Sequence, residues 1–327
     1  MFSKNKSISG KVVVITGASS GVGLATAIAF AKEGCRLVLA ARGPQALEEA
    51  AHECFVWTSE VLYKTTDVSK AKDVKSLVEH ALENYGRIDI WVNNAGVMAS
   101  GKFEDIPMEV NEQVIQTNLM GYMHGAYYVL PVFKKQEEGV LINNVSIGGY
   151  MPAPFSAVYS ATKFGIKGMM AGLQSEYSVY PNIHICNLYP QIQRSTGNMH
   201  SAKYSGLDFK IPPIAADPKD TARCFVNLAK YPQNDKFPDA TSYMIKTLHG
   251  FFPQTTTNLM HSGLRTMMKV KNSEDDAGNI LKPSEGQHRI YGETSLPVPS
   301  KKTKNIISAG VIIGAGLLLI KAFTKKR

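Results

Sequence analysis

The sequence predicts an α/β protein with one doubly wound parallel sheet and helices on both of its faces. Six short apolar runs alternate with helical stretches over residues 11–190, and right-handed crossovers between parallel strands place each helix over the sheet. The runs are continuous and rich in β-branched residues, which is typical of strands buried on both faces. They span residues 11–16, 35–41, 61–64, 88–93, 139–145 and 184–188.

The helices between these strands follow from apolar spacing and from the residues at their ends. Residues 72–84 carry apolar side chains at i, i+3, i+4 and i+7. Gly34 can end the first helix in a left-handed turn, and Asp217-Pro218 can start the last one. The predicted helices span residues 24–32, 47–54, 72–84, 107–135, 156–180 and 218–230.

Two further amphipathic helices, at residues 243–252 and 255–268, carry methionine and phenylalanine side chains on one side. Such stripes usually pack inward, so an edge of the core is one interpretation. The other is an adaptable wall that faces an apolar substrate or a membrane surface.

The net charge excludes some classes of protein. The 327 residues sum to +9, but residues 301–327 hold seven basic residues and no acidic one, so the body is nearly neutral. A nucleic-acid-binding body is therefore not expected, because it would need basic residues along one face. The four cysteines lie far apart without a CxxC pair, which argues against a disulfide framework or a metal site. The polar start, residues 1–11, lacks the apolar region of a cleaved signal peptide.

A glycine-rich segment, Thr16–Gly23, lies between the first strand and the first helix. Its glycines allow the backbone to approach a pyrophosphate, and the helix N-terminus supplies N–H donors and a partial positive charge. The segment therefore predicts a nucleotide site formed by Gly17, Ser19, Ser20, Gly21, Val22 and Gly23.

The end of the second strand indicates which nucleotide binds. NAD sites usually carry an acidic residue there for the ribose hydroxyls, but this chain has Ala41 followed by Arg42. A guanidinium suits a 2′-phosphate, so we expect NADP rather than NAD. The alternative is a solvated arginine in a loop.

A second group of residues predicts acid–base chemistry. Tyr159 and Lys163 lie four apart on one helix face, where the ammonium can stabilise the phenolate. Tyr159 can then exchange a proton with an alcohol or carbonyl oxygen, to which Ser146, at the end of the fifth strand, can hydrogen-bond. Asn118 lies inside a long helix, where a buried asparagine indicates a bent backbone or a polar partner.

These motifs together resemble the classical short-chain dehydrogenase/reductase family over residues 10–230. The shared features are TGASSGVG (16–23), Asp67-Val68, NNAG (93–96), Asn118, Ser146 and YSATK (159–163), in the family's order. The resemblance implies a Rossmann-type sheet of about seven strands and hydride transfer between a nicotinamide cofactor and a carbonyl/alcohol pair. For the seventh strand we expect residues 239–243.

The resemblance also implies roles for individual residues. Tyr159 would be the acid–base group, Lys163 would lower its pKa and hold the ribose, Ser146 would orient the substrate oxygen, and Asn118 would keep a helix kink and a proton-relay water. Asp67, Val68, Asn94, Ala95, Gly96 and Pro190 would line the cofactor. The family usually has glycine after this proline, whereas this chain has Gln191, which puts the arrangement at the nicotinamide end in question.

The end of the chain predicts a membrane anchor. Residues 306–320 are uncharged, and a helix continued through 323 would measure about 27 Å, close to the ~30 Å hydrocarbon core. Basic residues flank it on both sides, which suits anionic headgroups. A buried core helix is the alternative. We therefore divide the chain into a catalytic domain (1–268), a polar linker (269–304), a transmembrane helix (305–323) and a basic tail (324–327). Gly310 and Gly314 could support a homo-oligomer.

The functional hypothesis is a membrane-tethered, NADP-dependent reductase or dehydrogenase that acts on a small lipophilic carbonyl or alcohol, with its catalytic domain in the cytoplasm. One alternative is an NADP-binding sensor or scaffold protein without turnover, for which Gln191 is the sequence argument. Another is a structural membrane protein that uses the tail for assembly.

Overall fold

The computed structural model describes residues 6–208, 211–212, 215–267, 269–270, 274–284, 288–294, 297–299 and 303. The predicted transmembrane helix (305–323) and basic tail (324–327) lie outside these residues. Within the described part of the chain, no helix is both long and apolar enough to cross a membrane.

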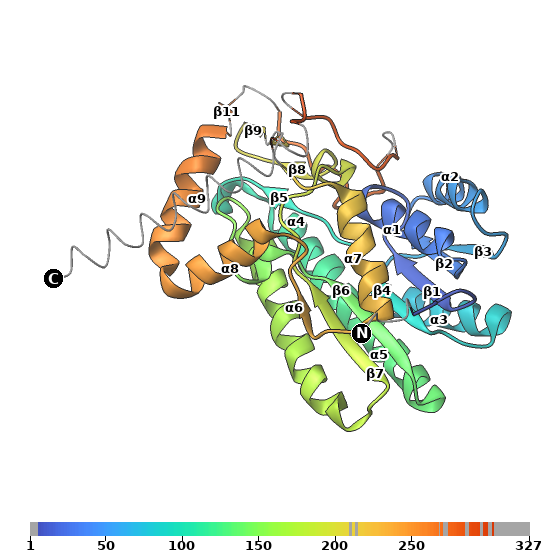
Figure 1. The fold of residues 1–327 in the computed structure, drawn as a ribbon. Helices are drawn as coiled ribbons and strands as arrows, with labels where there is room; N and C mark the ends of the chain where they lie inside the picture. Colours follow the sequence, from blue (N-terminus) through green and yellow to red (C-terminus); the bar gives the residue numbers. More distant parts are fainter. Residues whose placement is uncertain are drawn as a thin grey trace.

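A seven-stranded parallel sheet forms the centre of the molecule, with the strand order β10-β7-β6-β4-β1-β2-β3 (Figure 1). Its strands are β1 (Val12–Thr16), β2 (Arg36–Ala41), β3 (Val61–Thr65), β4 (Ile90–Asn93), β6 (Gly139–Asn144), β7 (Ile183–Leu188) and β10 (Asp235–Lys236). The chain order reverses between β1 and β4, and this reversal is where open α/β sheets bind ligands.

Helices cover both faces of the sheet, as the alternation of apolar runs predicted. One face carries α1 (Gly21–Lys32), α2 (Pro44–Phe55) and α7 (Pro218–Lys230); the other carries α3 (Ala71–Tyr85), α4 (Met108–Ile115), α5 (Gly121–Gln136) and α6 (Ala157–Glu176). The apolar side chains of the strands form a separate core with each set of helices. All four cysteines are free thiols, and Cys35, Cys54 and Cys186 are buried, which confirms that they form no disulfide framework.

The prediction for the seventh strand was wrong. The strand is Asp235–Lys236, and residues 240–251 form helix α8 (Ala240–Phe251) instead. The reason is the cap: the Asp239 carboxylate accepts hydrogen bonds from the N–H and the hydroxyl of Ser242, at 2.8 and 2.9 Å. A carboxylate that satisfies the first N–H groups of a helix favours helix initiation over strand pairing.

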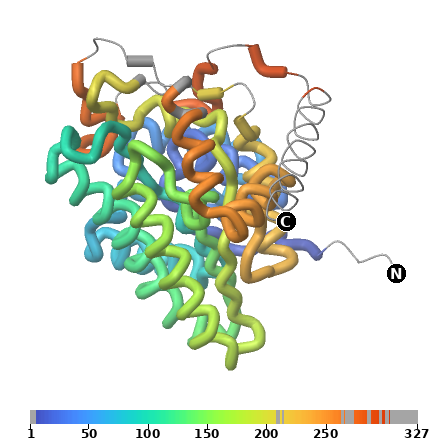
Figure 2. The backbone as a smooth tube through the Cα atoms, turned by 90° about the vertical axis from the view of Figure 1, so that its left-hand side faces the viewer, coloured from blue at the N-terminus to red at the C-terminus, as the bar shows by residue number. Residues whose placement is uncertain are grey.

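The carboxyl end of the sheet is covered by segments from the last third of the chain. Helices α8 and α9 (Pro253–Met267) pack as a pair beside this end (Figure 1). Two short ladders lie here as well, β5 (Ala99–Ser100) with β8 (Ala202–Lys203) and β9 (Leu207–Asp208) with β11 (Lys269–Val270). Figure 2 shows segments from the yellow and the red part of the chain together at this end. Residues 274–284 and 288–294, predicted as linker, hydrogen-bond to the domain here.

Candidate active site

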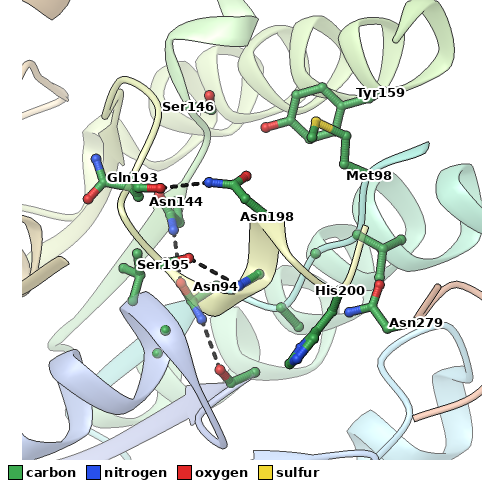
Figure 3. Close-up of a pocket in the computed structure, with 18 of the residues that line it drawn as sticks. Asn94, Met98, Asn144, Ser146, Tyr159, Gln193, Ser195, Asn198, His200 and Asn279 are labelled. Atoms are coloured by element: carbon green, nitrogen blue, oxygen red, sulfur yellow. Dashed lines mark hydrogen bonds between the residues drawn. The ribbon is translucent and has the colours of Figure 1, made fainter. Parts of the chain in front are cut away.

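A cavity of about 350 Å³ opens at the carboxyl ends of β1, β2, β4, β6 and β7 (Figure 3). Most of the residues singled out in the sequence line it. These are Gly17, Ser19, Ser20, Gly21, Val22, Gly23, Arg42, Val68, Asn94, Ala95, Gly96, Ser146, Tyr159, Lys163 and Pro190. Asn118 and Asp67 are not among its walls.

The glycine-rich segment turns sharply between β1 and α1. Gly17 has φ +66°, and a Cβ there would lie 2.7 Å from the Cα of Ala95, so only glycine fits. Ser20 occupies the N-cap of α1 without a side-chain hydrogen bond, and Gly21–Gly23 face the cavity. The Gly21 N–H donates to the Arg289 carbonyl, and the other N–H groups of this helix N-terminus, which has no side-chain cap, suit the pyrophosphate of a dinucleotide.

Asparagine side chains hold the strand ends together around the cavity. The Asn94 amide donates to the backbone carbonyls of Thr16 and Gly17, at 3.0 and 3.2 Å, and accepts from the Asn144 amide at 2.8 Å (Figure 3). These contacts tie the ends of β1, β4 and β6 to one another. Because such hydrogen bonds to buried carbonyls have no solvent substitute, they fix the shape of the glycine-rich turn.

Ser146 and Tyr159 border the same end of the cavity (Figure 3). Ser146 has φ +85°, an uncommon conformation for a residue other than glycine, and its hydroxyl accepts a hydrogen bond from the Gly148 N–H at 3.2 Å. Such strained backbone is often found at functional sites. Burial raises the pKa of Tyr159, and the Ser146 hydroxyl acts in the opposite direction.

Lys163 lies one turn beyond Tyr159 on α6 and is 5% exposed. Its Nζ donates to the backbone carbonyl of Asn144 at 3.2 Å and lies 5.1 Å from the ring centre of Tyr122 and 5.5 Å from that of Tyr159. No carboxylate offsets its burial, so the pKa of Lys163 falls to about 7. An amine in this state can move a proton near neutral pH.

Asn118 lies in a π-helical turn, Gln116–Met120, between α4 and α5, which confirms the bent backbone that the sequence predicted. Its side chain is fully buried. The amide oxygen accepts from the Val97 N–H at 2.8 Å, and the amide nitrogen donates to the Val97 carbonyl at 2.9 Å and to the Thr162 hydroxyl at 3.2 Å. Asn118 is thus a positioning residue that joins the chain after β4 to the helix of Tyr159.

Arg42 and Asp67 differ in their relation to the cavity. The Arg42 guanidinium lines it and donates to the backbone carbonyls of Asn279 and Ile280, the latter at 3.0 Å. Five N–H groups are available on a guanidinium, so others remain for a ligand. The Asp67 carboxylate instead accepts from the N–H and the hydroxyl of Ser69, at 3.1 and 2.7 Å, beside the cavity.

Gln191 does not distort the loop in which the family usually has glycine. It is absent from the residues with positive φ, so its backbone is accessible to any residue. Its side-chain amide donates to the Asp239 carboxylate at 3.2 Å, which connects this loop to the start of α8. The φ restriction that the sequence argument used therefore does not apply, while the Gln191 side chain still lines the cavity.

Several cavity residues were not found from the sequence. Asn144 could have been, because it is a polar residue at the end of a buried strand. Others come from loops and from the C-terminal segment, where no periodic pattern places a side chain. They include Met98, Gln193, Ser195, Asn198, His200, Asn279, Ser284 and His288, whereas Met260 lies on the Met-rich helix that the sequence offered as a wall for an apolar substrate.

Comparison with known proteins agrees with this geometry. The family model of the short chain dehydrogenases matches residues 11–204, and the chain belongs to this family. An uncharacterized oxidoreductase of Listeria innocua, Lin0452, is 40% identical over 184 residues, which cover 56% of this chain and 74% of that protein. The uncharacterized oxidoreductase YxnA of Bacillus subtilis is 30% identical over 263 residues, 79% of this chain and 73% of that protein.

Solved structures show the same fold. An alcohol dehydrogenase of the archaeon Thermococcus sibiricus, complexed with 5-hydroxy-NADP, has a TM-score of 0.60 and 29% identity, covering 69% of this chain and 95% of that one. A 3-ketoacyl-(acyl-carrier-protein) reductase of Brucella melitensis, complexed with NADH, has a TM-score of 0.63 and 27% identity, covering 71% and 97%. The chain is therefore an oxidoreductase of this family with a nicotinamide cofactor site.

The buried amine of Lys163 gives a test of the site through stability. Its folded pKa is below the usual 10.5, so between about pH 7 and 10.5 the unfolded chain binds more protons and stability rises with pH. Methionine has no charge to bury, so the cost of burying the ammonium group is removed. The Asn144 carbonyl, which loses Lys163 as a donor, still accepts from the Tyr122 hydroxyl at 2.7 Å. Lys163→Met should raise the midpoint of thermal unfolding most at or below pH 7, and the gain should fade towards pH 10.

The matched control is Lys72→Met at an exposed position of α3, which should leave the midpoint unchanged at every pH. Calorimetry across pH 6–10 measures both variants. A lower midpoint for Lys163→Met at pH 6 would contradict the burial of an uncompensated amine.

Proposed function

We propose that this protein is an NADP(H)-dependent reductase or dehydrogenase that interconverts a lipophilic carbonyl compound and its alcohol at a membrane. The observation that carries the proposal is the convergence of Ser146, Tyr159 and Lys163 at one end of the nucleotide cavity. Bound nicotinamide supplies or accepts the hydride. The remaining chemistry is a proton exchange at the substrate oxygen, which this chain's own side chains can perform.

The roles follow from the donors and acceptors at that end. In the reductive direction, the Tyr159 hydroxyl donates its proton to the carbonyl oxygen as negative charge develops there. The Ser146 hydroxyl donates a second hydrogen bond to the same oxygen. Lys163, whose Nζ lies 5.5 Å from the centre of the Tyr159 ring, stabilises the remaining phenolate in its protonated form, and the phenolate in turn favours that form, because opposite charges stabilise each other.

A preference for NADP is supported by the end of β2. Ala41 lines the cavity where an NAD site usually has a carboxylate, and the Arg42 guanidinium borders the same space. Relatives of known structure carry both forms of the nucleotide, so this argument depends on these two residues.

A lipophilic substrate is supported by apolar side chains in the lining of the cavity that contains Tyr159. Met98, Ile147, Met151 and Met260 line the same cavity, and Met260 comes from α9. Methionine side chains adapt to irregular apolar ligands, so this wall suits a hydrophobic carbonyl compound better than a charged one.

We further propose that residues 305–323 anchor the protein in a membrane with the catalytic domain in the cytoplasm, where a lipophilic substrate would be concentrated. The support is the uncharged run and its basic flanks. Deleting residues 301–327 should release an active enzyme from the membrane fraction; a truncated protein that still sediments with membranes would exclude this anchor. Self-association through Gly310 and Gly314 stays a prediction.

Replacement of the acid–base group tests the catalytic proposal. Tyr159→Phe should lower kcat by about 10²–10⁴-fold, the range for a lost general acid–base group, and leave the dissociation constant of NADPH within about twofold. Rates are measured as NADPH oxidation with a panel of lipophilic ketones and aldehydes. Tyr127→Phe, at an exposed position of α5, is the control and should be fully active. Equal activity of the Tyr159 variant would exclude this residue as the proton donor.

Coenzyme preference is a separate measurement. The unmodified chain should have a higher kcat/KM for NADPH than for NADH, and Ala41→Asp should reverse the order, because a carboxylate repels the 2′-phosphate and accepts from the ribose hydroxyls. Arg42→Ala should lower the NADPH preference by about tenfold, the effect of one charge-assisted hydrogen bond. An unmodified chain that prefers NADH would refute the assignment.

A further inference from the structure

The C-terminal segment after α9 folds back over the cavity. We call residues 274–284 and 288–294 the C-terminal strap; they follow the part of the chain that the family model matches. Asp276 and Lys203 exchange two backbone hydrogen bonds, at 2.7 and 2.8 Å, and the Asn279 N–H donates to the His200 carbonyl at 2.8 Å. Ile280 is fully buried in a cluster with Val97 and other apolar residues. The strap is thus packed as part of the domain.

The strap contacts both the start of α1, which follows the glycine-rich turn, and Arg42, which follows β2. The Arg289 carbonyl accepts from the Gly21 N–H at 3.0 Å and from the Thr196 hydroxyl at 2.9 Å, beside the glycine-rich turn. The Arg42 guanidinium donates to the carbonyls of Asn279 and Ile280. Four strap residues line the cavity, namely Asn279, Pro283, Ser284 and His288. The strap therefore forms a wall beside the end of β2, where the adenosine half of a dinucleotide lies in such folds.

Two buried side-chain acceptors of the strap have no partner among the described residues. The Asn279 side-chain oxygen makes no hydrogen bond within the described residues, and neither does Nδ1 of His288. His288 Nε2 donates to the Ser284 carbonyl at 3.0 Å, which leaves Nδ1 as an acceptor in the neutral ring. A buried acceptor without a donor is unfavourable, and native proteins rarely keep two of them in one cavity wall without a use. Figure 3 shows Asn279 beside His200 at one side of the pocket.

We infer that the C-terminal strap is part of the nucleotide site and that Asn279 and His288 recognise the adenosine half. Adenosine carries the donors that these acceptors lack: the exocyclic amine of the base and the ribose hydroxyls. The Asn279 oxygen and His288 Nδ1 accept from these groups, and the Arg42 guanidinium, held by the strap carbonyls, faces the same ligand. This assignment adds residues beyond the glycine-rich segment to the set that determines nucleotide affinity.

Nucleotide fragments test the assignment without any turnover. Titration calorimetry on the full-length protein in detergent measures the dissociation constants of NADH, NADPH, AMP and adenosine 2′,5′-bisphosphate. The variants are then compared with the fragment that the unmodified chain binds more tightly and with the dinucleotide that contains it. Asn279→Ala and His288→Ala should each weaken that fragment about tenfold, the effect of one lost hydrogen bond in a buried site. NADH or NADPH should weaken by the same factor, because the nicotinamide half does not touch the strap.

Lys282→Ala is the matched control, since Lys282 is an exposed strap residue outside the cavity. It should change neither constant by more than twofold. The inference is overturned if the Asn279 and His288 variants bind the fragment as the control does. It is also overturned if the loss is larger for the dinucleotide than for the fragment, which indicates a general loosening of the site.

Hydrogen exchange on the unmodified protein gives an answer even if a variant does not fold. Saturation with the dinucleotide should slow amide exchange in peptides covering residues 274–294, relative to peptides of α8. Unchanged exchange in the strap would also overturn the inference. This test is separate from the proposal that the protein prefers NADP. If the unmodified chain binds AMP more tightly than adenosine 2′,5′-bisphosphate, the NADP preference is refuted, and the role of the strap is then tested with AMP.

Discussion

Asn144 connects the glycine-rich turn to the residues around Tyr159, the first through its side-chain amide and the second through its backbone carbonyl. Its side-chain amide donates to Asn94, which holds the glycine-rich turn, and its backbone carbonyl accepts from the Lys163 amine and the Tyr122 hydroxyl. The nucleotide turn and the proton-transfer residues are therefore positioned from the same strand end. Because β6 is paired on both sides, by β4 and β7, this strand end has little freedom to move. The geometry of the whole cavity depends on that rigidity.

The site also contains groups that a protein selected for stability alone would avoid. Ser146 has a positive φ, Lys163 is an amine buried without a carboxylate, and the Asn279 oxygen has no donor within the described residues. Each of these is unfavourable in the folded chain, and each faces the same cavity. These unfavourable groups gather at one cavity, whereas the two cores on either side of the sheet are packed regularly. An enzyme with a preorganised site requires this combination.

The sequence predicted the sheet and its helices well because these depend on local patterns, and it named Ser146, Tyr159 and Lys163, which line one cavity. The continuous, β-branched apolar runs are typical of buried strands, and Tyr159 and Lys163 share a helix face by their spacing alone. The seventh strand was missed because two residues, Asp235–Lys236, carry no pattern, whereas the Asp239 cap decided the next segment. The strap was missed for a related reason: it is polar and contains proline, so only long-range contacts such as those of Arg42 with Asn279 and Ile280 place it. Asp67 was expected at the cofactor, but its contacts with Ser69 hold its carboxylate beside the cavity.

The most direct test of this account follows a labelled hydride. The full-length protein is incubated with NADPH that carries deuterium at the pro-R position of C4 and, separately, at the pro-S position, together with lipophilic ketones and aldehydes, and the products are analysed by mass spectrometry. The account predicts an alcohol with one deuterium on the former carbonyl carbon, formed from one face of the ring only. Tight binding of NADPH with no labelled alcohol from any ketone or aldehyde would contradict it, because the cavity would then bind the nucleotide without using Tyr159 and Lys163.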